Sequence, residues 1–264
     1  MIYGGSQAAE DVVFRTLLFR FFNKPETWLA LEHGRGELTA ADFDPAAYAE
    51  ILDRQMAAGR TIYSAAYIVP PPPFGHARKH RNHLALIEHM MSNNVASLVT
   101  DAISLEQIFR TFASFPSLGP FLAYQLTIDL NYSSIIDFDE DEFVVAGPGA
   151  ASGLAKCFPG AHDVSAADLI RWMVDTQSDQ IAHYGVQFQD LFGRPLKLID
   201  CQNLFCETDK YARVAHPTVR GVGNRTRIKQ QFAAKGPLDA PFFPPKWRLC
   251  PISAEPGMPL VAVG

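Results

Sequence analysis

The sequence has few cysteines, and they form no pattern typical of a metal site. Cys157, Cys201, Cys206 and Cys250 are scattered and include no CxxC pair. Structural zinc sites need ligands at short, regular spacings, so a zinc protein is disfavoured. No apolar run approaches the about 20 residues of a transmembrane helix, and the polar N-terminus differs from a secretory signal. We therefore expect free thiols, no membrane partner and a cytoplasmic, reducing setting.

Two further absences narrow the fold and the chemistry. The chain contains no GK[ST] triplet, so it has no P-loop for a nucleotide. Strand-like alternation of apolar and polar residues is rare, and we find no repeat and no low-complexity segment. Apolar residues make up 48% and charged residues 19% of the 264 positions, as in ordinary globular proteins. We predict a mainly α fold with few short strands.

Helical spacing of apolar residues dominates the first 215 positions. Asp44 and Pro45 mark the start of one helix and Gly59 its end, while Ser104 followed by Gln107 forms a capping-box pattern. We expect helices over residues 8–22, 45–58, 104–115, 165–185 and 197–216, one ending near residue 91, one starting near residue 120, and a short one capped by Thr27.

Charge divides the chain unevenly. Between residues 210 and 248, nine basic residues oppose one acid, whereas residues 137–142, DFDEDE, hold five acids. This separation suits a polyanion held beside an acidic pocket, although two unrelated solvated patches would give the same pattern. The net charge of -5 disfavours a general nucleic-acid coat. We expect a helical domain over residues 1–215 and a basic, Pro/Gly-rich arm over residues 216–264 packed on it.

Residues 115–119, FPSLG, form a tight turn before a helix. Gly119 permits close backbone approach, and the helix that follows begins with unpaired N–H groups at its positive dipole end. A DNA phosphate fits such a helix start, which makes Ser117 and Gly119 candidates for DNA binding. An ordinary corner between two helices would have the same letters.

Three other stretches are candidates for holding an anion or a substrate, each with a plainer alternative. Gly147 and Gly149 with Lys156 could cradle an anion or form a structural turn. The helical pair Glu207 and Lys210 could orient a substrate or be a surface ion pair. Residues 76–83, HARKHRNH, contain Arg78 and Lys79, which could face phosphates or simply solvent.

The turn at residues 115–119 resembles the hairpin of helix-hairpin-helix DNA glycosylases, whose pattern is apolar-Pro-Gly-apolar-Gly before a helix. That family has a catalytic Asp 24 positions after the first apolar residue, and here Asp139 stands 24 positions after Phe115. Ser117 replaces the first glycine of the pattern. Phe121 stands where bifunctional members carry a lysine nucleophile. The resemblance implies a glycosylase-like helical scaffold without lyase chemistry.

Four stretches resemble the helical domain associated with 5-hydroxymethyl-deoxyuridine DNA kinases, also described as α-glutamyl/putrescinyl-thymine pyrophosphorylase-like. The resemblance covers about residues 8–215. It implies modification of thymine in DNA, typically in phages: a kinase pyrophosphorylates hydroxymethyluracil, and an enzyme of this helical family displaces the pyrophosphate with an amino acid such as glycine. Because a P-loop is missing, the chain resembles the stand-alone transferase. The four stretches are FRTLLFRFFNKPETW, FPSLGPFLAYQLTIDLNY, EDEFVVAGPGA and DCQNLFCETDKYAR.

The resemblance implies roles for individual residues. The target base must leave the duplex, the amine must lose a proton, and pyrophosphate needs balancing cations. A divalent metal ion bound with the pyrophosphate is the one cofactor considered, and a hydroxymethyluracil DNA kinase is an expected partner beside DNA and the amino acid. The expected catalytic residues are Asp139, Asp141, Glu207 and Lys210; the expected substrate contacts are Arg15, Arg20, Asn23, Gln125, Asp129, Asn131, Tyr132, Gly147, Gly149 and Lys156; the expected DNA contacts are Arg78, Lys79, Ser117, Gly119, Arg225 and Arg227.

Three alternatives remain open at this point. A monofunctional DNA glycosylase would use Asp139 to stabilise a cationic sugar. A non-catalytic DNA-binding partner would position a separate hydroxymethyluracil DNA kinase. A metabolic enzyme would act on free nucleotides, which the acidic net charge mildly favours.

Overall fold

The computed structural model describes residues 3–65, 69–188, 193–223, 226, 228 and 243–249. These residues form α-helices and one short 3-10 helix, so the predicted mainly α fold is confirmed. The few short strands that we predicted are not present among these residues. Within these ranges no helix is both long and apolar enough to span a bilayer. The elements are α1 (Ala9–Phe22), α2 (Pro25–Arg35), α3 (Pro45–Ala57), α4 (Lys79–Ser92), α5 (Val95–Thr100), α6 (Leu105–Ala113), α7 (Pro120–Asn131), α8 (Pro148–Cys157), α9 (Ala166–His183), α10 (Leu198–Ala215) and η1 (Pro245–Trp247).

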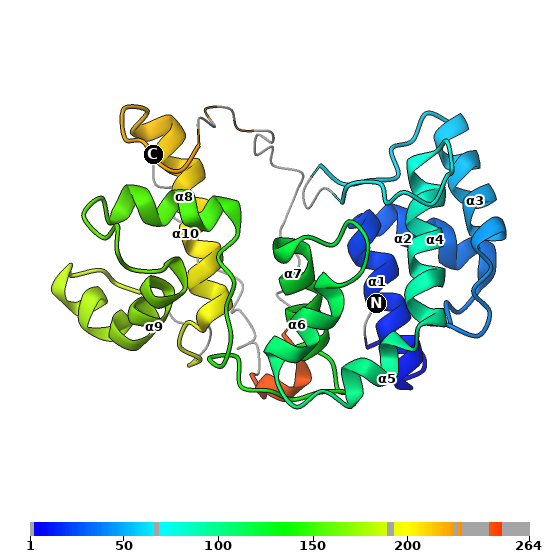
Figure 1. Ribbon diagram of the computed structural model, residues 1–264, viewed down its shortest axis with the longest axis horizontal. Coiled ribbons are helices and arrows are strands. Elements are labelled where there is room, and N and C mark those ends of the chain that lie inside the picture. The colour runs from blue at the N-terminus through cyan, green and yellow to red at the C-terminus, as the bar shows by residue number, and fades with distance from the viewer. Residues whose placement is uncertain are drawn as a thin grey trace, which may run out of the picture.

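The helices form two groups, each around its own hydrophobic core (Figure 1). Helices α1 to α5 lie on one side, with α1 packed against α4, α5 and α7. Helices α8, α9 and α10 lie on the other side, with α8 and α10 in close contact. Helices α6 and α7 stand between the two groups and pack on each other.

Helix α7 is apolar on nearly every side because it contributes to both cores. Leu122, Leu126 and Leu130 belong to the core of the first group. Tyr124 and Ile128 belong to the core of the second group. A helix buried from two sides has no face that must be polar, which explains why its sequence shows no amphipathic stripe. Each of these side chains contributes roughly 1.5 to 3 kcal/mol through burial, so α7 joins the two groups firmly.

The predicted helix starts are confirmed at Asp44 and Ser104, whose side chains accept hydrogen bonds from backbone N–H groups of α3 and α6. The predicted cap at Thr27 is wrong. Helix α2 begins two residues earlier at Pro25, with Lys24 in an extended conformation before it. Proline suits the first helical position and disfavours a helical residue before it. The Thr27 hydroxyl donates to a backbone carbonyl instead.

Glycines allow α8 and α10 to pack with their backbones in contact. A Cβ atom on Gly153 would lie 2.0 Å from the carbonyl oxygen of Phe205, and one on Gly149 would lie 2.8 Å from Cys206 Sγ. No side chain larger than hydrogen fits at Gly153 unless the two helices separate. Packing therefore accounts for two of the glycines in the GPGAASG stretch.

We predict that Gly153→Ala lowers the free energy of unfolding by about 1 to 3 kcal/mol, because the added methyl group overlaps the α10 backbone. This loss should appear although alanine is the better helix former by about 1 kcal/mol. Urea unfolding would measure it. Gly160→Ala is the matched control, since a Cβ there meets no atom within 4 Å. Equal midpoints for the two variants would contradict the packing described above.

Candidate functional site

The acidic loop, residues 137–142, is fastened to the C-terminal end of α7 by Asn131. The Asn131 side chain donates from Nδ2 to the Phe138 carbonyl oxygen at 3.0 Å and accepts from the Phe138 N–H at 2.9 Å. Asn131 is fully buried, so both bonds are shielded from water. The predicted substrate contact Asn131 thus holds the acids in position.

The two predicted catalytic aspartates of the acidic loop differ in surroundings. Asp141 accepts a hydrogen bond from Lys197 Nζ and another, at 3.3 Å, from the first backbone N–H of α10. Arg171 of α9 donates to two carbonyl oxygens of the loop, including that of Asp141. The Asp139 side chain is 74% exposed and lies 4.0 Å from Lys197 Nζ. Asp141 is therefore part of the framework, whereas Asp139 faces solvent.

Glu140 is the buried acid of the loop. Arg194 Nη2 donates to its Oε2 at 2.7 Å, and Trp247 Nε1 donates to its Oε1 at 2.6 Å. The same guanidinium bonds to Asp200 at 2.8 Å and stacks 3.9 Å from the centre of the Trp247 ring. Burial raises the pKa of Glu140 above its ordinary value, although Arg194 and Trp247 act in the opposite direction.

Tyr132 closes this cluster from the side of α7. Its ring meets the Trp247 ring edge-on, with centroids 5.3 Å apart. Burial raises the pKa of Tyr132 well above its ordinary value, and the nearby charges of Glu140 and Asp200 add to the shift. The phenol therefore stays protonated at neutral pH and can only donate or accept a hydrogen bond as a neutral group.

Arg20 and Asp129, both predicted substrate contacts, bind each other. Arg20 Nε and Nη2 donate to the two carboxylate oxygens of Asp129, and the side chains are 13% and 18% exposed. This is the two-pronged geometry expected for an amino-acid carboxylate. In the structure the Asp129 carboxylate binds the Arg20 guanidinium at the place where the carboxylate of an amino-acid substrate was expected.

The remaining substrate candidates of the first group are spread out. Arg15 is buried and donates to the carbonyl oxygen of Ser6 in the N-terminal segment. Asn23 ends α1 and donates to the Ser64 hydroxyl at 3.2 Å. Gln125 is buried in α7, and its Nε2 atom has no hydrogen-bond partner among the described residues.

The predicted phosphate-binding turn lies where α7 begins. Gly119 is the N-cap of α7, and a Cβ there would meet nothing within 4 Å. Ser117 has a φ angle of 62°, in the left-handed region that favours glycine. A Cβ on Gly147, the N-cap of α8, would lie 2.6 Å from the Phe121 ring. The N-terminal ends of α7 and α8 are therefore neighbours, and the Gly147 N–H donates inward to Gln202.

The basic start of α4 makes internal contacts. Arg78 and Arg81 each reach Asp53 of α3 at 2.6 Å, and His80 reaches it at 3.0 Å. A hydrogen bond from Arg81 outweighs burial and holds the pKa of Asp53 below its ordinary value. Lys79 Nζ lies 4.5 Å from the centre of the Tyr63 ring. The predicted DNA contacts Arg225 and Arg227 lie outside the described residues.

The second charged centre lies between α8 and α10. Asp209 is almost fully buried and accepts from Ser152 Oγ at 2.8 Å, from Lys156 Nζ at 2.9 Å and from Arg213. Burial by itself would raise the pKa of Asp209. The three hydrogen bonds together lower the pKa by more than burial raises it, so the pKa of Asp209 lies below its ordinary value. Glu207 and Lys210 form an ion pair of 2.5 Å on the exposed side of α10, away from the buried Asp209.

The structure does not bring all predicted residues into one cluster. Asp141 binds Leu198 at the start of α10, whereas Lys156 binds Asp209, eleven residues further along that helix. At about 1.5 Å per residue, these positions are roughly 17 Å apart. The acidic loop and the α8–α10 centre are therefore separate.

Sequence reasoning missed several residues of both centres. Glu140 was one of five acids in a run, and nothing local singles it out from its neighbours. Its partners come from distant segments, which spacing cannot reveal. Only the helical i, i+4 spacing of Asp209 and Arg213 was a usable signal. The missed residues are Glu140, Arg194, Asp200, Asp209, Arg213 and Trp247.

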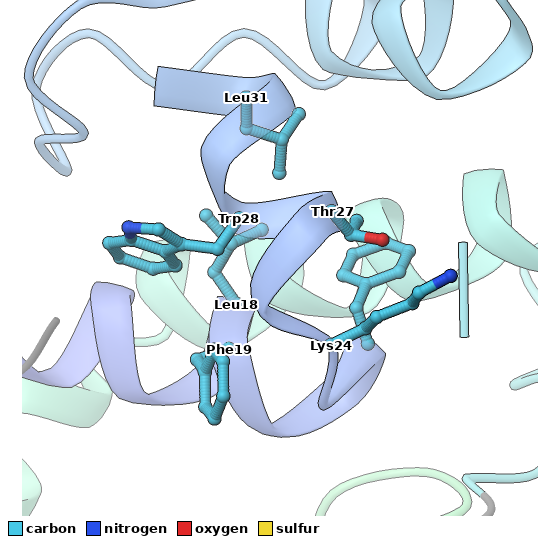
Figure 2. A pocket seen from close by; sticks show the side chains of 7 residues that line it. Leu18, Phe19, Lys24, Thr27, Trp28 and Leu31 are labelled. Carbon is cyan, nitrogen blue, oxygen red and sulfur yellow. The ribbon is translucent and has the colours of Figure 1, made fainter. Parts of the chain in front are cut away.

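A hollow between α1 and α2 is not a ligand site (Figure 2). Its side chains, among them Phe19, Lys24 and Trp28, leave no room for a water molecule. Lys24 Nζ donates to the Thr61 hydroxyl at 2.7 Å. Among the described residues, no group of three or more His, Cys, Asp or Glu side chains is placed to hold a metal ion.

Comparison with known proteins gives a family match and a relative. A family model described as 5-hmdU DNA kinase, helical domain, matches residues 1–221. The chain is 23% identical over 221 residues to a 5-hmdU DNA kinase of Bacillus phage SP10. That match covers 78% of this chain and 34% of the relative, so the chain spans about a third of the relative's length. No solved structure matches.

We predict that Asp209 makes stability fall in acid. Because its folded-state pKa is lowered, its contribution is fully present above the unfolded value of about 3.9 and is lost as pH falls through the lower folded-state pKa. Asp209→Asn should cost about 3 to 5 kcal/mol at pH 7, since it leaves Lys156 and Arg213 without a carboxylate. Urea unfolding at pH 7, 5 and 3 would show this deficit shrinking with pH.

The control for that series is Asp175→Asn, which removes an exposed carboxylate of α9. It should track the unaltered protein at each pH. A deficit for Asp209→Asn that stays constant down to pH 3 would contradict the assignment.

Proposed function

Because the chain belongs to the 5-hmdU DNA kinase helical-domain family, we propose that it acts on a hydroxymethyluracil-derived base in DNA. The proposed reaction transfers an amino acid such as glycine onto 5-pyrophosphoryloxymethyl-uracil and releases pyrophosphate. The family match over residues 1–221 carries the proposal, since it includes both helical groups and the acids of both charged centres. The sequence contains no GK[ST] triplet, which favours a step other than P-loop phosphorylation.

The adjacent N-terminal ends of α7 and α8 support DNA binding. Both ends carry a positive dipole, and two such ends side by side attract phosphates. Ser117 adopts the backbone shape that the helix-hairpin-helix pattern assigns to glycine, which supports a glycosylase-like hairpin. With Gly119 open to its surroundings, a DNA strand would approach the start of α7. The base to be modified would leave the duplex there.

The chemistry needs a proton acceptor and a balanced leaving group. The amine nitrogen forms a bond to the 5-methylene carbon while the bond from that carbon to the pyrophosphate oxygen breaks. Pyrophosphate leaves with the bonding electrons, and the surplus proton on nitrogen passes to a carboxylate. Cations must surround the departing oxygens, and reacting groups must lie within about 3 to 3.5 Å of each other.

Among the predicted acids, Glu207 lies nearest along the chain to the α8–α10 centre. It lies two residues from Asp209, which holds Lys156, and Lys210 is 2.5 Å away to orient it. Asp139 and Asp141 lie at the other end of α10. We therefore place proton transfer at Glu207 and pyrophosphate beside Lys156, with Asp139 and Asp141 as the competing candidates for the proton.

A second candidate function is a DNA-binding module that positions a hydroxymethyluracil DNA kinase without catalysis of its own. The match to about a third of a 5-hmdU DNA kinase favours it. On this alternative the chain binds hydroxymethyluracil DNA but leaves every base at its original mass.

The test is the mass of the nucleosides. Duplex DNA bearing pyrophosphorylated hydroxymethyluracil is incubated with the protein and single amino acids, then digested and analysed by mass spectrometry. We expect one amino acid to replace pyrophosphate, and Glu207→Gln to slow this at least about 100-fold, the usual contribution of a general base. The exposed position of Glu207 makes folding of the variant secure.

Asp141→Asn is the matched comparison because it makes the same kind of change at the distant centre. Product loss in Asp141→Asn but not in Glu207→Gln would move the chemistry to the acidic loop. Unchanged base masses with intact DNA binding would contradict transfer and favour the non-catalytic module. Abasic sites would instead indicate a monofunctional glycosylase.

A further inference from the structure

We infer that the chain has a binding site for a phosphate group in a pocket between α8, the end of α10 and the segment at residues 217–223. We call it the α8–α10 pocket. Its cavity has a volume of about 70 Å³. The side chains that line it and carry the inference are Ser152, Lys156, Arg213, Arg220 and Thr226.

Among the described residues of the α8–α10 pocket, positive charge exceeds negative charge. Asp209 beneath it supplies one negative charge to two cations, Lys156 and Arg213, whose side chains are only 7% and 11% exposed. Arg220 adds a third cation at the rim, and within the described part of the chain no carboxylate lies within ion-pairing distance of it. Buried surplus charge is costly unless a counter-charge is bound. A doubly negative phosphate would balance the three cations and the one acid.

The wall of the pocket is built closely against α8. A Cβ on Gly221 would lie 2.2 Å from Ser152 Oγ and 2.6 Å from the Ser152 carbonyl oxygen. The segment therefore runs over α8 with no intervening side chain. The Thr226 hydroxyl lines the same space and can donate to an oxyanion, whereas the Ser152 hydroxyl donates to Asp209.

The size of the cavity suits a phosphate group. Its volume of about 70 Å³ exceeds the roughly 10 to 15 Å³ that a single water molecule needs, so one compact tetrahedral oxyanion fits. The group could belong to pyrophosphate or to the DNA backbone. The choice of these two sources rests on the proposed function. Binding of either ligand can be measured without any turnover, so the pocket is tested separately from the reaction.

The experiment compares Arg220→Gln with Arg54→Gln. Each variant removes one exposed arginine charge, and Arg54 lies on α3 in the other helical group (Figure 1). Calorimetry measures binding of inorganic pyrophosphate and, separately, of an unmodified DNA duplex at fixed salt. Thermal unfolding without ligand confirms that both variants fold.

We expect Arg220→Gln to weaken one of the two ligands at least about tenfold, the value of one charge-assisted hydrogen bond. Arg54→Gln should bind like the unaltered protein. Weakened pyrophosphate binding assigns the pocket to the leaving group, and weakened duplex binding alone assigns it to the DNA backbone. If Arg220→Gln matches Arg54→Gln for both ligands, the inference is wrong.

The results of this experiment distinguish a failure of the phosphate site from a failure of the proposed transfer reaction. Selective loss of phosphate binding in Arg220→Gln together with absent amino-acid transfer by the unaltered protein would contradict the transferase proposal alone. Transfer that proceeds equally in both variants, with equal binding, would contradict the pocket alone.

Discussion

The burial of α7 between two hydrophobic cores is the constraint on which the rest of the molecule depends. One row of its side chains packs with α1 and its neighbours, and another packs with α8, α9 and α10. Because the helix is fixed from both sides, its two ends are fixed as well. The N-terminal end presents Gly119 next to the start of α8. The C-terminal end carries Asn131, which sets the position of the acidic loop.

Helix α10 also fixes different parts of the molecule at different points along its length. Its first turn binds Asp141 of the acidic loop, its second turn binds Gly147 through Gln202, and its second half places Asp209 against Lys156. The acidic loop with its ion pairs therefore lies at the start of α10, and the cation-rich α8–α10 pocket lies near its end. A buried cluster such as that of Glu140 and Arg194 fixes geometry, because removing one partner leaves the other charge uncompensated. A pocket with surplus cations can bind a ligand.

Local signals in the sequence were enough for most of the helices and for the turn before α7, but not for α8, whose glycine-rich start was interpreted as a turn or an anion cradle. Asp44 and Ser104 cap their helices as their chemistry predicts, since such caps need only neighbouring N–H groups. Contacts between distant segments could not be predicted. Glu140 and Arg194 are 54 positions apart, and no spacing rule links them. The glycines of α8 were ambiguous because glycine serves close packing and anion binding for the same reason, the missing side chain.

The central claim is that DNA lies across the adjacent starts of α7 and α8, and hydrogen exchange of the complex tests it most directly. The first N–H groups of a helix lack intrahelical partners and exchange quickly in the free protein. With a duplex carrying the modified base bound, the account predicts slowed exchange in the first turns of α7 and α8 and no change in α3. Bound DNA that leaves both helix starts exchanging at the free rate would contradict it.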